Sequence, residues 1–315
     1  MRQFIVVRLI SMVFTLFGLS ILVFLLARLI PGDVVQLSLE QAERTPEMVS
    51  ELRSFFGLDQ PLHVQYWRWL SDVLQGDLGT SWRSGNSVTG LILDRISVTA
   101  ELTILAMVVS IGLGVPLGIL AATSQNSPLD YLVRVLSMFS LSIPEFWQGI
   151  MLILVLSITL GWIPSLEYVD FWKDPGTNLS IMILPAISVG TVASANIVRM
   201  TRATMLEELR QDYVRTARAK GLHERVVIYS HTLRNTLIPV ITIAGLQIGY
   251  LMGGIVVMEA VFTLPGVGRL MLLAISQRDY PLIQGVVLFI ATIFVFSNLL
   301  VDVLYAYVNP RIRYG

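Results

Sequence analysis

The sequence is dominated by long apolar runs that alternate with polar segments. Five runs are free of charged residues over about 20 positions, the length a helix needs to cross the hydrocarbon core of a bilayer. They are Leu9–Ala27, Leu102–Thr123, Pro175–Val198, Asn235–Met258 and Pro281–Val301. A sixth run, from Val135 to Ile163, is interrupted by Pro144-Glu145. We therefore predict an all-α membrane protein with six transmembrane helices.

These runs divide the chain into three parts. Residues 1–30 hold the N-terminus and the first transmembrane helix, residues 31–97 form an external segment, and residues 98–315 form a core of five helices. The predicted bounds of those five helices are about 100–123, 135–161, 180–199, 235–259 and 281–307. Residues 200–234 form a polar loop between the third and fourth of these five helices. The first run is longer than the apolar part of a signal peptide, so we expect it to remain as a helix.

The distribution of lysine and arginine predicts the orientation in the membrane. Cytoplasmic loops of membrane proteins carry an excess of these residues. Placing the N-terminus in the cytoplasm puts 13 of the 22 basic residues on the cytoplasmic side, eight of them between Arg199 and Arg234. We therefore expect both termini to be cytoplasmic.

Composition agrees with a membrane protein and excludes several functions. Hydrophobic residues make up 54% of the chain and charged residues only 14%, against about 25% charged in soluble proteins. The 22 basic and 22 acidic residues cancel, so a nucleic-acid partner is not expected. The chain has no cysteine and three scattered histidines, so we expect no metal site. The two lysines precede Asp174 and Gly221, so the chain has no Walker A loop.

The external segment 31–97 carries nine acidic residues and five arginines. Its aromatic stretch, Tyr66-Trp67-Arg68-Trp69-Leu70, is of the kind that favours the boundary between membrane and water. Two interpretations stay open: a short helix that lies on the outer surface, or a docking surface for an external protein.

The polar loop between Arg199 and Thr236 is amphipathic. Its apolar residues recur at helical spacing, which predicts two helical pieces separated at Gly221, with Gly221 in the left-handed conformation that ends many helices. These residues are Met205, Leu206, Leu209, Tyr213, Ala217, Leu222, Val226, Val227, Tyr229 and Leu233. Four acidic residues offset half of the eight basic ones. This balance favours a helix that docks into a groove of another protein over a patch that binds lipid headgroups.

Several residues within the predicted spans are candidates for the pore or for helix packing. Gly245, Gly249 and Gly253 form a face that another helix can approach closely, as a moving contact or a static one. Gly114 and Gly118 suggest a smaller packing face. The polar candidates for a hydrated path or an interhelical bond are Gln247, Glu145 and Asp302. Three charged residues near the outer ends are expected to reach water: Glu101, Arg28 and Glu259.

The loop resembles that of the permease subunits of peptide-type ABC importers. The similarity lies in Asp212-Tyr-Val-Arg-Thr-Ala-Arg-Ala-Lys-Gly221 and His231-Thr-Leu-Arg-Asn235. Motifs similar to those of the family occur in order along the whole chain. They are Pro31-Gly-Asp33, Phe56-Gly-Leu-Asp-Gln-Pro61, Gly76-Asp-Leu-Gly79, Leu184-Pro185, Pro265-Gly-Val-Gly268, Arg278-Asp-Tyr-Pro281 and Asn309-Pro-Arg-Ile-Arg313. The chain looks most like the first of the two permeases in dipeptide, oligopeptide or glutathione importers.

This resemblance implies a type I importer permease fold in the bacterial inner membrane. It implies a pore formed with a second, related permease as a heterodimer, two P-loop ATPases in the cytoplasm and an external substrate-binding protein. This chain would bind no cofactor, because ATP and magnesium would lie on the ATPases. The segment 200–234 would be the coupling loop, and its ATPase-coupling residues would be Glu207, Asp212, Tyr213, Arg215, Ala217, Arg218, Lys220, Gly221 and Leu222.

Two other classes of protein are weighed against this hypothesis. A self-contained secondary transporter or channel would need no ATPase and therefore no docking helix in the cytoplasm. An enzyme that works within the membrane would need a catalytic constellation, and the predicted spans contain none. We therefore expect a non-catalytic transporter subunit. The resemblance does not identify the cargo, because an external binding protein selects it.

Overall fold

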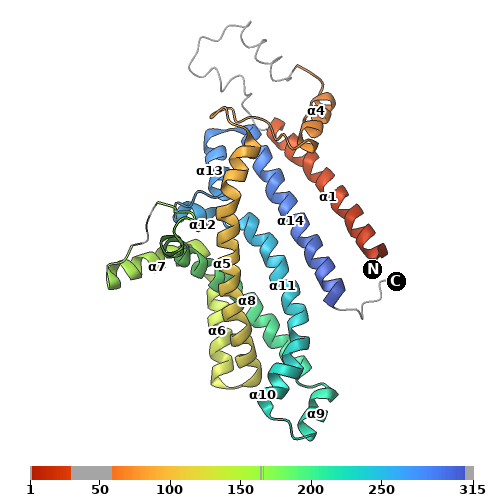
Figure 1. Ribbon diagram of the computed structural model, residues 1–315, viewed down its shortest axis with the longest axis vertical. Coiled ribbons are helices and arrows are strands. Elements are labelled where there is room, and N and C mark those ends of the chain that lie inside the picture. Colours follow the sequence, from red (N-terminus) through yellow and green to blue (C-terminus); the bar gives the residue numbers. More distant parts are fainter. Residues whose placement is uncertain (1, 30–58, 164, 166, 309–315) are drawn as a thin grey trace.

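The computed structural model describes residues 2–29, 59–163, 165 and 167–308. The predicted motifs at Pro31–Asp33 and Asn309–Arg313, and all of the external segment before Asp59 with the first residues of the motif at 56–61, lie outside the described residues. In the described part every regular element is a helix (Figure 1). The elements are α1 (Arg2–Leu29), α4 (Leu62–Leu74), α5 (Val88–Thr123), α6 (Pro128–Ser142), α7 (Glu145–Leu160), α8 (Pro175–Glu208), α9 (Asp212–Ala219), α10 (Glu224–Val226), the π-helix η1 (Val227–Thr232), α11 (Leu233–Gly254), α12 (Val256–Val261), α13 (Val267–Gln277) and α14 (Tyr280–Val308).

Five helices of the described residues, α1, α5, α8, α11 and α14, are long and apolar enough to cross a membrane. A sixth span exists if α6 and α7 are taken together. The all-α membrane fold predicted from the sequence is therefore confirmed. Two helices extend well past their predicted ends: α5 begins at Val88, where Ser87 accepts a capping hydrogen bond from the Gly90 amide, and α8 continues to Glu208.

The third predicted span, 135–161, differs from a single straight helix. It is split into α6 and α7, whose axes meet at an angle of 102°. The break falls at Pro144, which has no amide hydrogen to donate to a helix. Ile143 is extended, with φ −98° and ψ 128°, as expected for a residue that precedes proline. Although the sequence marks the position of the break, the angle is a property of the fold.

The packing of α5 against α8 forms the centre of the molecule, and these two helices make its most extensive contact. A Cβ atom at Gly114 would lie 2.6 Å from the side chain of Ile197, and one at Gly118 would lie 2.5 Å from that of Thr201. The absence of side chains at both glycines allows the close approach, as the sequence predicts. The largest cluster of buried apolar side chains, which includes Leu102 and Met182, is built around this pair.

One end of the bundle is organised by α4, which lies at the end of α1 (Figure 1). Tyr66 of α4 is buried, its hydroxyl lies 2.8 Å from that of Ser20, and its ring meets that of Phe24 edge to face. Trp67 of the same helix is 59% exposed. Only part of the predicted aromatic helix is therefore used for packing.

Glu259 corrects a prediction, because it does not reach water. The residue is fully buried, and its carboxylate accepts hydrogen bonds from the hydroxyl of Thr99 and from the amide of Arg269 near the beginning of α13. A Cβ atom at Gly266 would overlap this carboxylate. Helix N-termini have unpaired amide hydrogens that stabilise negative charge. Glu259 thus joins α12, α13 and α5.

Asp130 connects the turn between α5 and α6 to α8. Its side chain is fully buried and receives two hydrogen bonds from the guanidinium of Arg202, at 2.7 and 2.8 Å. The amide of Asn126 donates a third, and Arg134 lies 3.4 Å away. Paired guanidinium contacts of this kind fix geometry as well as charge. Asp130 therefore holds α6 against the end of α8 from which the coupling loop begins.

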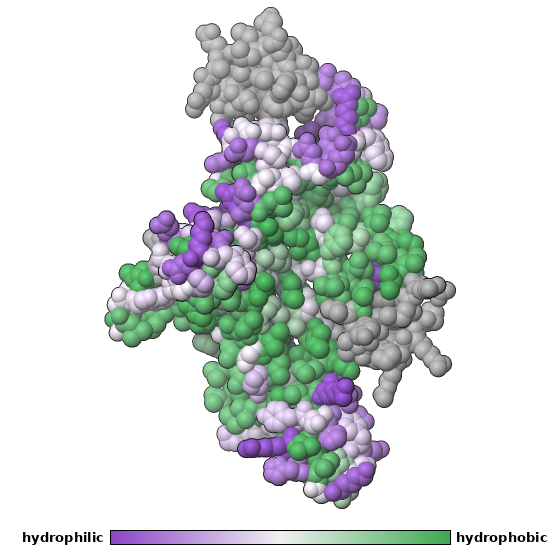
Figure 2. Space-filling model, in the orientation of Figure 1, coloured by the Kyte–Doolittle hydropathy of each residue, from purple (hydrophilic) through white to green (hydrophobic). Residues whose placement is uncertain are grey.

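Figure 2 shows how polarity is distributed over this fold. Hydrophobic residues cover most of the middle of the visible face, and hydrophilic residues gather at the lower end, around α4 near the upper end, and in a smaller group at the left, near α7. The lower hydrophilic end is the region of α9 and α10. This pattern matches a protein whose helices cross a bilayer and whose polar loops lie in water.

The α5–α8 contact generates a stability prediction. Gly118→Ala should lower the thermal unfolding temperature of the purified protein in detergent, because its methyl group would overlap Thr201 and overpacking costs about 1–3 kcal/mol. Gly112→Ala lies on the same helix with open space around it. That control should unfold at or above the wild-type temperature, and equal destabilisation by both changes would contradict the prediction.

A second prediction concerns the buried ion pair. Asp130→Asn should destabilise the protein by about 3 kcal/mol, because Arg202 would keep a largely buried charge without its partner. Thermal unfolding in detergent measures the effect. Asp94→Asn on the exposed part of α5 is the matched control and should leave the unfolding temperature unchanged. An Asp130→Asn protein as stable as the wild type would show that the pair is dispensable.

Candidate coupling site

The coupling loop contains a short amphipathic helix, α9, that begins at Asp212 after a turn at the end of α8. Val214 and Ala217 face inward and pack on Val227 of η1, while Arg215 and Thr216 between them are exposed. The chain turns at Gly221, which has φ +78°. The prediction that Gly221 ends the first helical piece in a left-handed conformation is confirmed.

The second helical piece is partly a π-helix, and this changes which side chains are buried. Six residues, Val227–Thr232, form η1, in which each turn contains more residues than an α-helix. The hydroxyl of Thr232 also donates to the carbonyl of Val227 at 2.9 Å. Tyr229 is one of the apolar positions that recur at helical spacing, and the structure leaves it 59% exposed. It also buries Val214, which the pattern omitted.

Tyr213 attaches α9 to the helices on either side of the loop. Its hydroxyl donates a short hydrogen bond to the carboxylate of Glu208 at the end of α8. It accepts one, at 3.1 Å, from the side-chain amide nitrogen of Asn235 on α11. Burial raises the pKa of the Tyr213 hydroxyl, and the hydrogen bond to Glu208 raises it further. The group therefore stays protonated and keeps donating to Glu208. The position of α9 is thereby tied to α8 and α11 at once.

The outward face of the loop mixes charge with exposed apolar side chains. Arg218 forms an ion pair with Glu224 at 2.7 Å, and its hydrogen bond lowers the pKa of that carboxyl. Arg215 pairs with Asp212 at 3.4 Å. The other predicted coupling residues with an exposed surface are Glu207, Lys220, Gly221 and Leu222, whereas Ala217 is buried.

Two further residues, Val226 and Tyr229, contribute exposed apolar surface next to this charged face, at 43% and 59% exposure. Both are among the apolar positions that recur at helical spacing, and that spacing alone does not show which of its members are exposed. Protein interfaces typically combine an apolar centre with a polar rim. The loop therefore presents a compact projection with a mixed surface, suited to a groove in another protein.

The glycine face of α11 packs against α14 of the same chain. A Cβ atom at Gly245 would overlap the side chain of Val301. One at Gly253 would lie 3.0 Å from the side chain of Ile290, and one at Gly249 would lie 3.2 Å from α14. The predicted close helix contact is confirmed. Within the described residues the face is occupied by α14, and whether this contact moves during transport stays a prediction.

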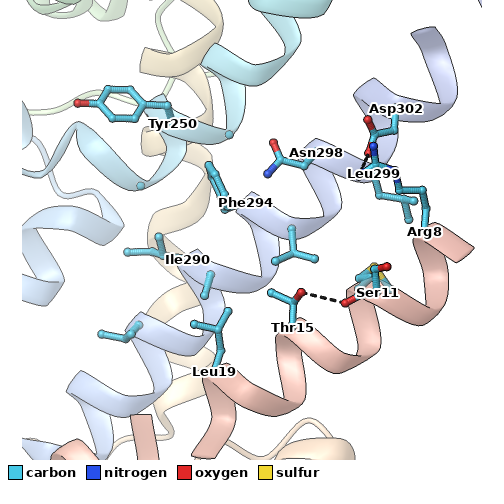
Figure 3. A pocket seen from close by; sticks show the side chains of 16 residues that line it. Arg8, Ser11, Thr15, Leu19, Tyr250, Ile290, Phe294, Asn298, Leu299 and Asp302 are labelled. Carbon is cyan, nitrogen blue, oxygen red and sulfur yellow. Dashed lines mark hydrogen bonds and ion pairs between the residues drawn. The ribbon is translucent and has the colours of Figure 1, made fainter. Parts of the chain in front are cut away.

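Asp302 forms a bond between two helices, which is one of the two roles that the sequence allowed for it. Its carboxylate lies 3.1 Å from the guanidinium of Arg8 on α1. Figure 3 shows the two side chains next to each other where α1 and α14 line a cavity of about 760 Å³. Tyr250 of α11 points away from this pair in the same view. The ion pair fastens the first helix, α1, to the last one.

Glu145 and Gln247 line a second cavity, between the α6–α7 break, α8 and α11. The amide nitrogen of Gln247 donates to the carbonyl of Ala193 at 2.8 Å. The backbone carbonyl of Glu145 accepts a hydrogen bond from the hydroxyl of Ser188 at 2.7 Å. Both residues therefore line the same cavity, and each is hydrogen-bonded to a residue of α8. Their role in a pore stays a prediction.

The described residues contain no group of three or more metal-ligating side chains.

Comparison with known proteins agrees with this geometry. The family model described as "Binding-protein-dependent transport system inner membrane component" matches residues 114–314, and a model of the N-terminal part of such membrane components matches residues 1–103. In an inward-facing structure of the MetNI methionine ABC transporter, one chain has the same fold, with a TM-score of 0.56 and 17% identity. The match covers 70% of this chain and 96% of that one.

Curated relatives match along nearly the whole sequence. The chain is 42% identical to the dipeptide transport system permease protein DppB of Alkalihalophilus pseudofirmus, with 98% of each chain covered. It is 41% identical to the glutathione transport system permease protein GsiC of Salmonella typhimurium, with both chains fully covered. Because a family model matches more than half of the chain and these relatives span it, the chain belongs to the inner-membrane permease components of binding-protein-dependent transport systems.

Proposed function

We propose that this chain forms half of the translocation pore of an ABC importer for peptides or similar small solutes. The observation that carries the proposal is the coupling loop, whose exposed face combines charged and apolar side chains and whose inner face is fastened to α8 and α11. The cargo class is supported by the relatives, which are named as permeases for dipeptides, di/tripeptides and glutathione.

As a member of this family the chain is a multi-pass protein of the bacterial inner membrane, and it works with ATPase and substrate-binding partners. The finer assembly is part of the proposal. We place both termini and the coupling loop in the cytoplasm, with a second, related permease beside the chain and one ATPase subunit against each coupling loop. ATP and magnesium bind to the ATPases, and the chain itself is non-catalytic and binds no cofactor.

The contacts of α9 suggest how movement of the ATPases is transmitted to the transmembrane helices. When ATP draws two ATPase subunits together, a helix seated in each groove moves with its subunit. In this chain α9 is bonded through Tyr213 to Glu208 and Asn235. A displacement of α9 therefore reaches the ends of α8 and α11 without crossing a flexible linker. Tilting of these helices would change the pore between outward-open and inward-open states.

The external end is the proposed site for the substrate-binding protein. Asp279 at the beginning of α14 accepts hydrogen bonds from the hydroxyl of Ser81 and the amide of Arg83. These bonds fix the loop before α5 onto the end of the bundle that lies opposite α9 (Figure 1). A rigid platform of this kind can transmit docking of an external protein to α5 and α14.

The proposal predicts a specific effect of Gly221→Val. A β-branched residue strains the left-handed backbone at this position, so the coupling surface should be displaced. We expect the variant to lose co-purification with the ATPases and most of the coupled ATP hydrolysis, measured on complexes purified through a C-terminal tag.

Gly161→Val is the matched control, because Gly161 has φ +62° with open space around it and lies at the end of α7, away from α9. It should retain the ATPases and their activity. Equal loss in both variants would indicate general misfolding. A chain that transports in liposomes without ATPases would overturn the proposal in favour of a self-contained transporter.

A further inference from the structure

The second cavity has a volume of about 940 Å³ and lies between the α6–α7 break, α8 and α11. This is within the range of small-molecule binding sites. Its polar lining comes from Glu145 on α7, Asn196 and Arg199 on α8, and Gln247 on α11. Three helices, α7, α8 and α11, thus contribute polar side chains to one cavity.

The polarity of this lining distinguishes the cavity from the outer surface of the bundle. Exposed side chains along α6, such as Leu132, Val135 and Phe139, are apolar, as expected where a helix faces lipid. Ionisable side chains within membrane spans face a protein interior or water, because the hydrocarbon core does not solvate charge. A cavity lined by Glu145 is therefore expected to face water or a protein interior and not the lipid.

The charged groups of the cavity are not satisfied by one another. The carboxylate of Glu145 has no hydrogen-bond or ion-pair partner among the described residues, whereas Asp302, Asp130 and Glu259 all have donors. Arg199 donates to the amide oxygen of Asn196 at 2.7 Å, and within the described residues it contacts no carboxylate. Among the described residues, the cavity thus contains the Glu145 carboxylate without a hydrogen-bond donor and the Arg199 guanidinium without a carboxylate partner.

The two charges occupy different levels of the cavity. Glu145 lies beside Ser188 of α8, to which its backbone is bonded. Arg199 is eleven residues further along the same helix, which corresponds to about 16 Å at 1.5 Å per residue. A solute that carries an ammonium group and a carboxylate can meet the two charges in sequence as it moves through such a cavity, because an extended dipeptide is shorter than this separation.

We propose that this cavity is a transient cargo site in the import path, where the carboxylate of Glu145 binds the ammonium group of a zwitterionic peptide-like solute and Arg199 meets its carboxylate. The inference rests on the proposed function and adds the chemistry of cargo recognition within the permease. Because each end offers a single charged contact, binding is weak enough to allow release.

Charge-selective labelling tests the cavity without requiring knowledge of the cargo. The chain has no cysteine, so Leu246→Cys, on an exposed cavity-lining residue of α11, would supply its only thiol. In the assembled complex that also carries Arg199→Gln, so that Glu145 is the charged group left in the lining, a cationic methanethiosulfonate should modify this thiol roughly tenfold faster than an anionic one, after correction for their rates with a free thiol, since Glu145 attracts cations. Adding Glu145→Gln should abolish the preference, and Leu132→Cys on the lipid-facing side of α6 should stay unmodified.

Uptake into proteoliposomes tests the role in transport. With the complete complex and its binding protein, and with L-alanyl-L-alanine and glutathione as probes, Glu145→Gln should lower initial uptake about tenfold, the loss expected for one ionic contact. ATP hydrolysis stimulated by the binding protein should persist. Glu145→Asp should restore most uptake, and Glu167→Gln in the exposed loop after α7 should match the wild type.

An unreactive thiol in the Leu246→Cys complex, labelling without charge preference, or wild-type uptake by Glu145→Gln would each overturn the inference. So would failure of the Glu145→Gln complex to assemble, because that result would assign the carboxylate a structural role. Failure of the wild-type chain to bind ATPases would instead contradict the proposed function, while the labelling result would still report on the cavity.

Discussion

The close contact between α5 and α8 supports the rest of the structure. In a bilayer, apolar helices gain little from leaving lipid for one another, so association depends on shape and on the few polar bonds between helices. Gly114 and Gly118 provide the shape, because they leave room for Ile197 and Thr201. The Asp130–Arg202 ion pair then fixes α6 to the same helix. As α8 continues into the coupling loop, this packed unit links the loop to the centre of the protein.

The acidic side chains of the bundle fall into two groups, and the difference between them points to function. The carboxylates of Asp130 and Asp302 each pair with a guanidinium, and that of Glu259 accepts hydrogen bonds. Each of the three joins helices that are distant in sequence. Such groups stabilise the fold, and removing their partners is costly. Glu145 has no such partner among the described residues and lines a large cavity. An unsatisfied carboxylate in a cavity is available to a ligand, which is why its role is assigned to cargo.

The coupling loop combines rigidity on one side with adaptability on the other. Its inner face is held by Val214, Ala217 and Val227, and by the hydrogen bonds of Tyr213. Its outer face carries side chains exposed to solvent, which can adjust to a partner. A loop that must transmit movement needs the first property, and one that must bind an ATPase needs the second. The α6–α7 break adds a different kind of feature, because it places Glu145 at a bend and not within a straight helix.

The sequence by itself determined the helices, their approximate number, the turn at Gly221 and the close contacts at the glycine faces. These are local properties, because apolar length, backbone conformation and the absence of a side chain depend on consecutive residues. It predicted Glu259 wrongly and missed the exposure of Tyr229. Burial of Glu259 depends on Thr99 and the beginning of α13, and Tyr229 lies in the π-helix η1, a geometry that the spacing of apolar residues does not indicate. Only the tertiary structure decided these points, since the donor that satisfies a charge and the face that a helix buries belong to segments far apart in the chain.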